Sequence, residues 1–137
     1  MDRLELLEST THGMLTTLRR DGRPQTSVVA HTFDSGTGII RISVTDGRAK
    51  TRNLRRDHRA SYCVTTPDLS SYLVADVDAE LLPVTTDPHD ATADELVEVY
   101  RAISGEHPDW DEYRSAMVAD RRLVLRLSVL HTYGWLR

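Results

Sequence analysis

One segment changes from apolar to basic at its middle: Ile39-Ile40-Arg41-Ile42-Ser43-Val44-Thr45-Asp46-Gly47-Arg48-Ala49-Lys50-Thr51-Arg52-Asn53-Leu54-Arg55-Arg56-Asp57-His58-Arg59. Its first six residues are rich in β-branched side chains, which predicts a strand over 39–44. Thr45-Asp46-Gly47 is a turn signal whose Asp or Gly can cap a helix start. The basic residues that follow predict a short helix, and we expect the rest of the chain to be arranged around this strand-to-helix unit.

The helical half of this segment is strongly basic. Residues 48–59 hold six of the 17 Lys and Arg residues of the chain, and Lys50 is its only lysine. The free N–H groups and the dipole at a helix start favour an anion. Arg48, Lys50, Thr51 and Arg52 add charge and a hydroxyl at that place, which suggests an anion site. A solvated basic helix face explains the charge run equally well, so both interpretations stay open here.

Length and composition indicate one domain over residues 1–137. The hydrophobic fraction of 39% and the charged fraction of 28% are typical of a soluble globular protein. A net charge of -4 argues against a nucleic-acid partner. A single cysteine, Cys63, excludes an internal disulfide and fits a reducing compartment. Neither a signal-peptide core nor a transmembrane run is present, so we expect a cytoplasmic protein without a membrane partner.

Six segments show strand patterns, and they are separated by turn signals. They cover residues 14–19, 24–33, 39–44, 60–66, 71–84 and 123–133. A short helix is expected over 3–8, with Gly13 as the break after it. Two further helices are expected over 93–104, ended by Gly105, and over 109–121, begun by a capping box of Asp109 and Glu112.

This order predicts a mainly β fold, a six-stranded antiparallel β-barrel with helical additions. A doubly wound parallel sheet is excluded because helices do not alternate with the strands. Gly36-Thr37-Gly38 is no dinucleotide loop, since the third glycine is missing and the loop joins two strands.

The sequence contains little catalytic machinery of its own. None of the six histidines pairs with another His or Cys at metal-ligand spacing, so we expect no metal site and mostly solvated or singly hydrogen-bonded histidines. Cys63 is expected to be an inert, partly buried thiol. Tyr133 and Trp135 could cap the barrel, pack in a dimer interface or stack on a planar ligand. An anion site without acid–base residues suits a protein whose cofactor carries the chemistry, or a phosphate-ligand binding module.

Three motifs resemble those of a known group of proteins. The first two are Leu15-Thr16-Thr17-Leu18 with Asp21-Gly22-Arg23-Pro24-Gln25, and Arg48-Ala49-Lys50-Thr51-Arg52-Asn53-Leu54-Arg55-Arg56-Asp57. They resemble the flavin/deazaflavin oxidoreductase superfamily, which includes pyridoxamine 5′-phosphate oxidase. The third, Tyr100-Arg101-Ala102-Ile103-Ser104-Gly105-Glu106-His107-Pro108-Asp109-Trp110-Asp111-Glu112-Tyr113-Arg114 with Met117 and Asp120-Arg121-Arg122, is similar to its actinobacterial coenzyme F420-binding branch.

The resemblance implies a split β-barrel of the FMN-binding type and a homodimer with two cofactor sites at the subunit interface. It implies that Arg48, Lys50 and Thr51 hold the coenzyme phosphate, with Arg52 beside them. It also implies that four residues of the second and third strands lie along the deazaflavin ring: Gln25, Ser27, Val28 and Ser43. Arg55 and Arg56 face either the oligoglutamate tail of F420 or solvent.

The implied reaction is hydride transfer from reduced F420 to an unsaturated small-molecule substrate, with the protein supplying position and electrostatics. No catalytic residue is identified, although Tyr72, Tyr133 or water could give the accompanying proton. Three alternatives stay open: an FMN-dependent enzyme on the same barrel, a non-catalytic carrier of F420 or another phosphate ligand, and a plain interaction protein. The dense positive charge after Lys50 favours F420 over FMN.

Overall fold

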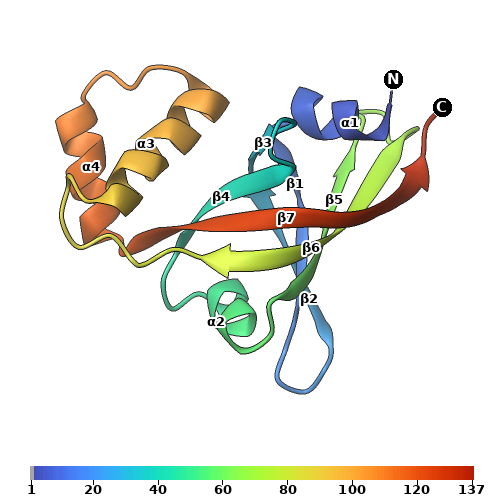
Figure 1. Cartoon of the computed structure of the whole chain (residues 1–137), viewed down its shortest axis with the longest axis horizontal. Helices are drawn as coiled ribbons and strands as arrows, with labels where there is room; N and C mark the ends of the chain where they lie inside the picture. Colours follow the sequence, from blue (N-terminus) through green and yellow to red (C-terminus); the bar gives the residue numbers. More distant parts are fainter. Residues whose placement is uncertain (1) are drawn as a thin grey trace.

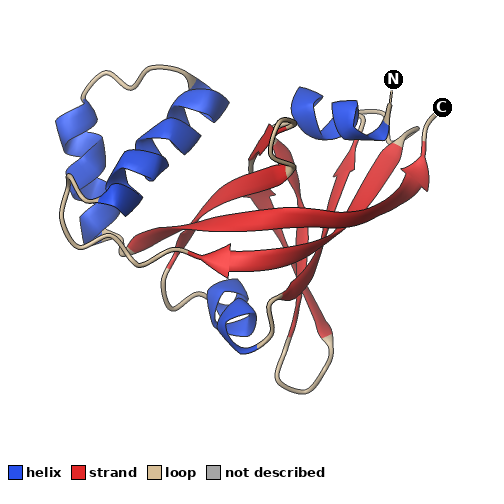
Figure 2. Cartoon of the chain, in the orientation of Figure 1, coloured by secondary structure: helices blue, strands red, loops and turns tan. Residues whose placement is uncertain are grey.

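The computed structural model describes residues 2–137, which fold into one curled antiparallel sheet with four helices (Figures 1 and 2). The elements in chain order are α1 Arg3–Ser9, β1 His12–Leu18, β2 Pro24–Ala30, β3 Thr32–Asp34, β4 Ile39–Thr45, α2 Ala49–Arg56, β5 Arg59–Thr65, β6 Tyr72–Leu81, α3 Ala91–Ser104, α4 Trp110–Ala119 and β7 Arg122–Trp135. None of the helices in residues 2–137 is long and apolar enough to cross a membrane.

The prediction of a mainly β fold with helical additions is confirmed, but the number of strands is seven rather than six. The order across the sheet is β2-β1-β5-β6-β7-β4-β3, and every neighbouring pair is antiparallel. The helical hairpin α3–α4 lies at one end of the curled sheet, and α1 lies with both chain termini at the other (Figure 1). The sheet thus separates a helical end from the end that carries the termini.

The additional strand arises because the predicted strand 24–33 breaks at His31. The His31 side chain is buried, its Nε2 lies 3.1 Å from the Leu7 carbonyl oxygen, and its Nδ1 contacts the Tyr62 hydroxyl. Its backbone N–H donates to the Thr11 carbonyl at 2.8 Å, one position beyond the last β1–β2 pair of His12 with Ala30. These contacts turn the chain from β2 into β3. His31 is therefore an exception to the expectation of mostly solvated or singly hydrogen-bonded histidines.

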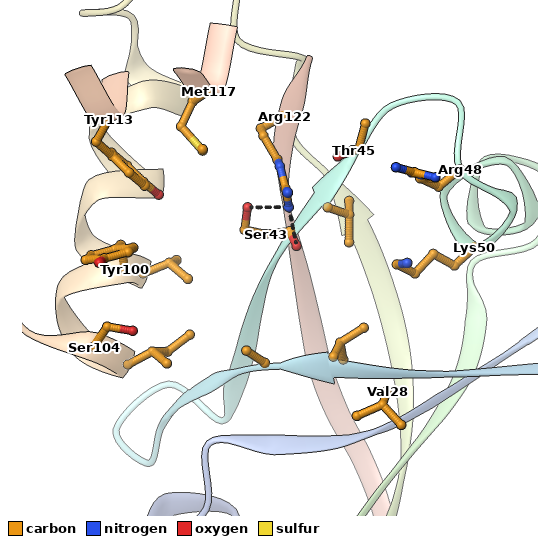
Figure 3. Close-up of a pocket in the computed structure, with 15 residues that line it drawn as sticks. Val28, Ser43, Thr45, Arg48, Lys50, Tyr100, Ser104, Tyr113, Met117 and Arg122 are labelled. Atoms are coloured by element: carbon orange, nitrogen blue, oxygen red, sulfur yellow. Dashed lines mark hydrogen bonds between the residues drawn. The ribbon is translucent and has the colours of Figure 1, made fainter. Parts of the chain in front are cut away.

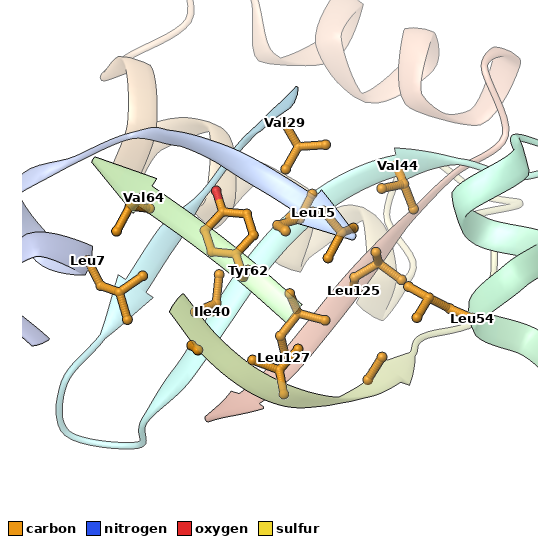
Figure 4. Packing of buried hydrophobic residues seen from close by; sticks show 14 of the residues in the cluster. Leu7, Leu15, Val29, Ile40, Val44, Leu54, Tyr62, Val64, Leu125 and Leu127 are labelled. Atoms are coloured by element: carbon orange, nitrogen blue, oxygen red, sulfur yellow. The ribbon is translucent and has the colours of Figure 1, made fainter. Parts of the chain in front are cut away.

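Alternate residues of the strands fill the inside of the sheet. Ile40 and Ile42 of β4 pair directly with Leu127 and Leu125 of β7, and all four are fully buried (Figure 4). Leu54 of α2 is equally buried against this core. Burying a leucine contributes about 1.5–3 kcal/mol, so this contact fixes the basic helix at the edge of the barrel.

A second, smaller core joins the helical hairpin to the sheet. Val124 points to the outer side of β7, opposite to its neighbours, and packs against Leu96, Val97 and Tyr113. The helix ends follow the sequence signals: the Asp109 carboxylate accepts from the Glu112 backbone N–H at 3.1 Å, and α3 ends at Gly105 with φ 82°. Gly13, in contrast, does not end α1 but lies in β1, where a Cβ would come within 2.5 Å of the Tyr62 ring.

Candidate functional site

A pocket of about 610 Å³ lies between the helical hairpin, the edge strand β2, the strand β4 and the start of α2 (Figure 3). Its walls come from segments far apart in the sequence. The lining residues are Val28, Val29, Ala30, Ser43, Val44, Thr45, Arg48, Lys50, Val99, Tyr100, Ile103, Ser104, Tyr113, Met117 and Arg122. This volume is within the range of small-molecule sites in proteins.

Three cations share this pocket. Arg48 is the extended residue before α2, Lys50 lies in the first turn of that helix, and Arg122 begins β7. The turn before Arg48 is possible because Gly47 has φ 86°, a left-handed conformation that suits glycine. Among the four helices, the N-termini of α1, α3 and α4 are capped by aspartates, whereas no side chain caps α2. The first N–H groups of α2 are thus not occupied by a capping side chain.

The positive charge in the pocket is only partly neutralised within the described chain. Arg122 Nε donates to Asp120 at 2.6 Å, and the other carboxylate nearby, Asp46, accepts from Arg55 and Arg121, each at 2.9 Å. Burial, followed by the proximity of Arg48 and Arg122, lowers the pKa of Lys50. Residues 2–137 contribute no ion pair to Arg48 or Lys50, so these two cations are available to an anionic ligand.

The opposite wall of the pocket is apolar and aromatic. Tyr100 and Ser104 of α3 line it, and the Tyr100 ring lies 4.9 Å from that of Tyr113 and 5.7 Å from that of Trp110, centroid to centroid (Figure 3). The Tyr113 hydroxyl donates to the Leu96 carbonyl at 3.1 Å, which ties α4 to α3. The side of the pocket opposite Arg48 and Lys50 is therefore lined by apolar and aromatic side chains held together across the helical hairpin.

A second, basic groove lies beside the β1–β2 hairpin and has a similar volume of about 610 Å³. It is lined by Arg19, Arg20, Gln25, Ala49, Arg52, Asn53, Arg55 and Arg56. The buried Asn53 amide donates to Gln25 at 2.8 Å and to Thr17 at 3.1 Å, which joins α2 to the hairpin. Arg56 donates to the Leu18 carbonyl at 2.7 Å. Helix α2 thus contributes to the pocket at its start and to this groove along its length.

The eight predicted binding residues divide between these two surfaces. Val28, Ser43, Arg48 and Lys50 line the pocket, whereas Gln25 and Arg52 line the basic groove. Thr51 is buried, and its hydroxyl donates to the Thr45 carbonyl at 3.0 Å. Ser27 is in the lining of neither surface. The structure thus gives these residues their positions, while their binding of a cofactor stays a prediction.

Arg122 and Tyr100 are among the pocket residues to which the sequence interpretation gave no binding role. Arg122 belongs to the third resemblance motif, but nothing in the local sequence shows that it reaches Ser43, 79 positions away along the chain. Tyr100 was predicted to lie on the packed face of a helix, and its spacing cannot show that this face also borders a cavity. Tyr72 and Tyr133, the predicted proton donors, line neither the pocket nor the basic groove.

The described residues outside the two surfaces show neither a reactive cysteine nor a metal site. Burial raises the pKa of the Cys63 thiol, which suits an unreactive cysteine. Residues 2–137 contain no cluster of three or more His, Cys, Asp or Glu side chains that could hold a metal ion. The chemistry available at the pocket is thus anion binding next to an apolar, aromatic wall.

Comparison with known proteins assigns the fold to a family. The family model described as pyridoxamine 5′-phosphate oxidase matches residues 3–136, almost the whole chain. The chain belongs to the pyridoxamine 5′-phosphate oxidase family. Its curled antiparallel sheet is accordingly the split barrel of that family.

Solved structures agree with this fold. One, named F420 reductase, is 24% identical over 97% of both chains, with a TM-score of 0.74. A conserved hypothetical protein from Mycobacterium tuberculosis is 21% identical over 98% of this chain and 84% of the other, with a TM-score of 0.75. An FAD-binding protein from Mesorhizobium loti is 16% identical over 98% and 92%, with a TM-score of 0.68. At these identities the likeness shows a shared fold and nothing more about this chain.

Proposed function

We propose that the protein is a coenzyme F420-dependent reductase that transfers a hydride from the reduced deazaflavin to an unsaturated organic acceptor. The observation that carries this proposal is the pocket itself. Two cations without an ion-pair partner in residues 2–137 meet a flat aromatic wall in a cavity large enough for a ligand. The fold likeness to a protein named F420 reductase supports the same choice of cofactor.

The residues of the pocket fit a cofactor that bears a phosphate and a planar ring. Arg48 and Lys50, with the uncapped start of α2, supply charged donors of the type that binds phosphate. Ser43 and Val28 lie on the strands that border the same cavity and offer one polar and one apolar side chain to a ring. Under this proposal, Thr51 supports the phosphate site by holding the start of α2 to the end of β4.

The chain's own residues then act by binding, orienting and excluding water. The bound cofactor supplies the hydride. Arg48 and Lys50 hold its phosphate, while the apolar wall around Ile103 and Met117 keeps water from the ring and the acceptor. Tyr72 and Tyr133 do not line the pocket, so either could donate a proton only to the cofactor site of a second copy that packs against the outer face of the sheet.

We also propose a homodimer, on the basis of the outer face of the sheet. Directly paired residues of five strands form an apolar row there, namely Val28, Met14, Cys63, Val74 and Tyr133. Val28 is 73% exposed, and next to this row Trp135 is 66% exposed. Exposed apolar surface of this kind is typical of an interface. Because Val28 also lines the pocket, a copy seated on the row would border the cofactor site.

FMN is the second candidate cofactor, because it brings a ring and a phosphate to the same cations. The basic groove favours F420, since F420 continues beyond its phosphate into lactate and an anionic glutamate tail. Arg20 and Arg52 line this groove, whereas Arg19 and Arg55 there are already paired with Asp21 and Asp46. Exposed ion pairs contribute only about 0.2–1 kcal/mol each, so this preference is expected to be modest.

The experiment that tests the function has two arms. Purified protein is titrated with F420 while the fluorescence of the cofactor is followed, and oxidation of F420H2 is then measured with quinones, enones and tetrapyrroles. We expect saturable binding and oxidation with at least one class of acceptor. Tight binding without oxidation across the panel supports the carrier function instead, and absence of binding rejects both.

A further inference from the structure

We propose that the side of the pocket next to α3 and α4 binds the acceptor, and that this acceptor is a flat, conjugated acid anchored through Arg122. This inference rests on the proposed function, because it assigns the part of the pocket that the cofactor phosphate does not need. It names a substrate class and a specificity-determining residue.

The first observation is the geometry of Arg122. Its Nε is fixed by Asp120 at 2.6 Å, but its Nη1 lies 3.5 Å from both the Ser43 hydroxyl and the Ser43 carbonyl, at the limit of a hydrogen bond. Nη2 has no hydrogen-bond partner within the described chain. The guanidinium points into the cavity beside Ser43 (Figure 3), so one edge of it is free to bind a carboxylate there.

The second observation is the charge balance. Arg48, Lys50 and Arg122 line the pocket, and Asp120, which is paired with Arg122, is the one carboxylate hydrogen-bonded to any of them in residues 2–137. The phosphate of F420 is a diester with a single negative charge. Binding it leaves an excess of one positive charge in the pocket. A partly desolvated cation is stabilised by an anion, so a second anionic group is expected.

The third observation is the shape and polarity of the opposite wall. The Tyr100 ring is held by its contacts with Tyr113 and Trp110, and Val99, Ile103 and Met117 continue the surface beside it. An apolar surface with aromatic side chains favours a flat, conjugated molecule. Tyr100 of α3 and Arg122 of β7 both line this pocket. Together they select an acceptor that is both flat and acidic.

The test uses two probes of the same shape, 2-naphthoate and 2-naphthamide, which differ in charge. Their dissociation constants are measured by calorimetry on the full-length protein saturated with F420. We expect naphthoate to bind about tenfold more tightly than naphthamide, as for a hydrogen bond to a charged group. Arg122→Gln should abolish this ratio and Arg122→Lys should keep part of it. The matched control Arg121→Gln removes the same charge outside the pocket and should leave the ratio unchanged.

The outcomes separate this inference from the proposed function. If F420 itself does not bind, the proposed function fails and this inference fails with it. If F420 binds but wild-type protein binds both probes equally, the acidic acceptor alone is rejected, and no variant is needed to reach that conclusion. Displacement of F420 by naphthoate also rejects it, since the acid would then occupy the phosphate site.

Discussion

Lys50 lines the same pocket as Arg48 and Arg122, and burial, together with the proximity of these two cations, lowers the pKa of its ammonium group. An anionic ligand would relieve this repulsion. We therefore expect Lys50→Ala to weaken F420 binding by roughly ten- to a hundredfold, because a lost hydrogen bond to a charged group costs about 1.5–3 kcal/mol. Lys50→Arg should also lose affinity, since the guanidinium differs in shape.

The measurement is a fluorescence titration of F420 at low salt. Arg59→Ala is the matched control, because it removes one positive charge from the same basic segment at an exposed side chain paired with Asp57. Unfolding of apo Lys50→Ala should resemble that of wild type, since Lys50 is not part of the core. An unchanged dissociation constant for Lys50→Ala would reject the phosphate assignment.

His31 makes a second prediction, on pH and stability. Burial lowers its pKa from the ordinary value of 6.5, and its Nε2–H is held by the Leu7 carbonyl. The unfolded chain therefore binds more protons than the folded one just below that pH, so the free energy of unfolding should fall as pH falls from 7.5 to 5.5. Urea unfolding across this range measures it. His31→Gln should weaken the dependence, and the exposed control His89→Gln should retain it. A free energy of unfolding that rises on acidification contradicts this account.

At the scale of the element, helix α2 presents basic residues to two surfaces. The Arg52 side chain has no hydrogen-bond or ion-pair partner within residues 2–137, and it lies in the basic groove about one turn beyond Arg48. We expect Arg52→Gln to weaken F420 several-fold at low salt, to leave FMN almost unchanged, and to lose its effect at high salt as the charges are screened. Titrations of both cofactors, with Arg59→Gln as control, check this. An equal effect on F420 and FMN would place Arg52 at the phosphate rather than at the tail.

Most elements could be predicted from the sequence because their signals are local. The β-branched residues of 39–44, the turn at Gly22 and the aspartate cap of α4 each depend on neighbouring residues. The break between β2 and β3 could not be predicted, because it depends on contacts of His31 with Leu7 and Tyr62, which are distant in sequence. The position of Arg122 in the pocket could not be predicted for the same reason, because its partner Ser43 lies on a strand that is distant in sequence.

The basic segment predicted only part of the candidate site. The basic segment indicated correctly where positive charge gathers, because a helix start after a strand places such side chains together. It could not show that Gln25 and Arg52 lie in a groove separate from the pocket with Arg48 and Lys50. This division depends on tertiary packing, because the buried Leu54 and the hydrogen bonds of Asn53 set the position of the helix against the barrel.

At the scale of the whole molecule, the exposed apolar row predicts association. Met14 lies within this row and pairs with Val28 on one side and Cys63 on the other. We expect wild-type protein to sediment as a dimer at micromolar concentration and Met14→Glu to shift it towards monomer, because a charge would be buried in the interface. Leu69→Glu, in the β5–β6 loop outside the row, is the control for an exposed apolar residue and should stay dimeric. A monomeric wild-type protein contradicts the proposal.

The central claim, that the pocket and the basic groove together bind F420, is tested most directly by competition between F420 and FMN for wild-type protein at low and at high ionic strength. We predict that F420 binds several-fold to about thirtyfold more tightly at low salt, from two exposed ion pairs to its tail, and that the ratio shrinks as salt rises. Equal affinities at low salt, or FMN that stays bound through purification, would contradict the claim and identify an FMN protein.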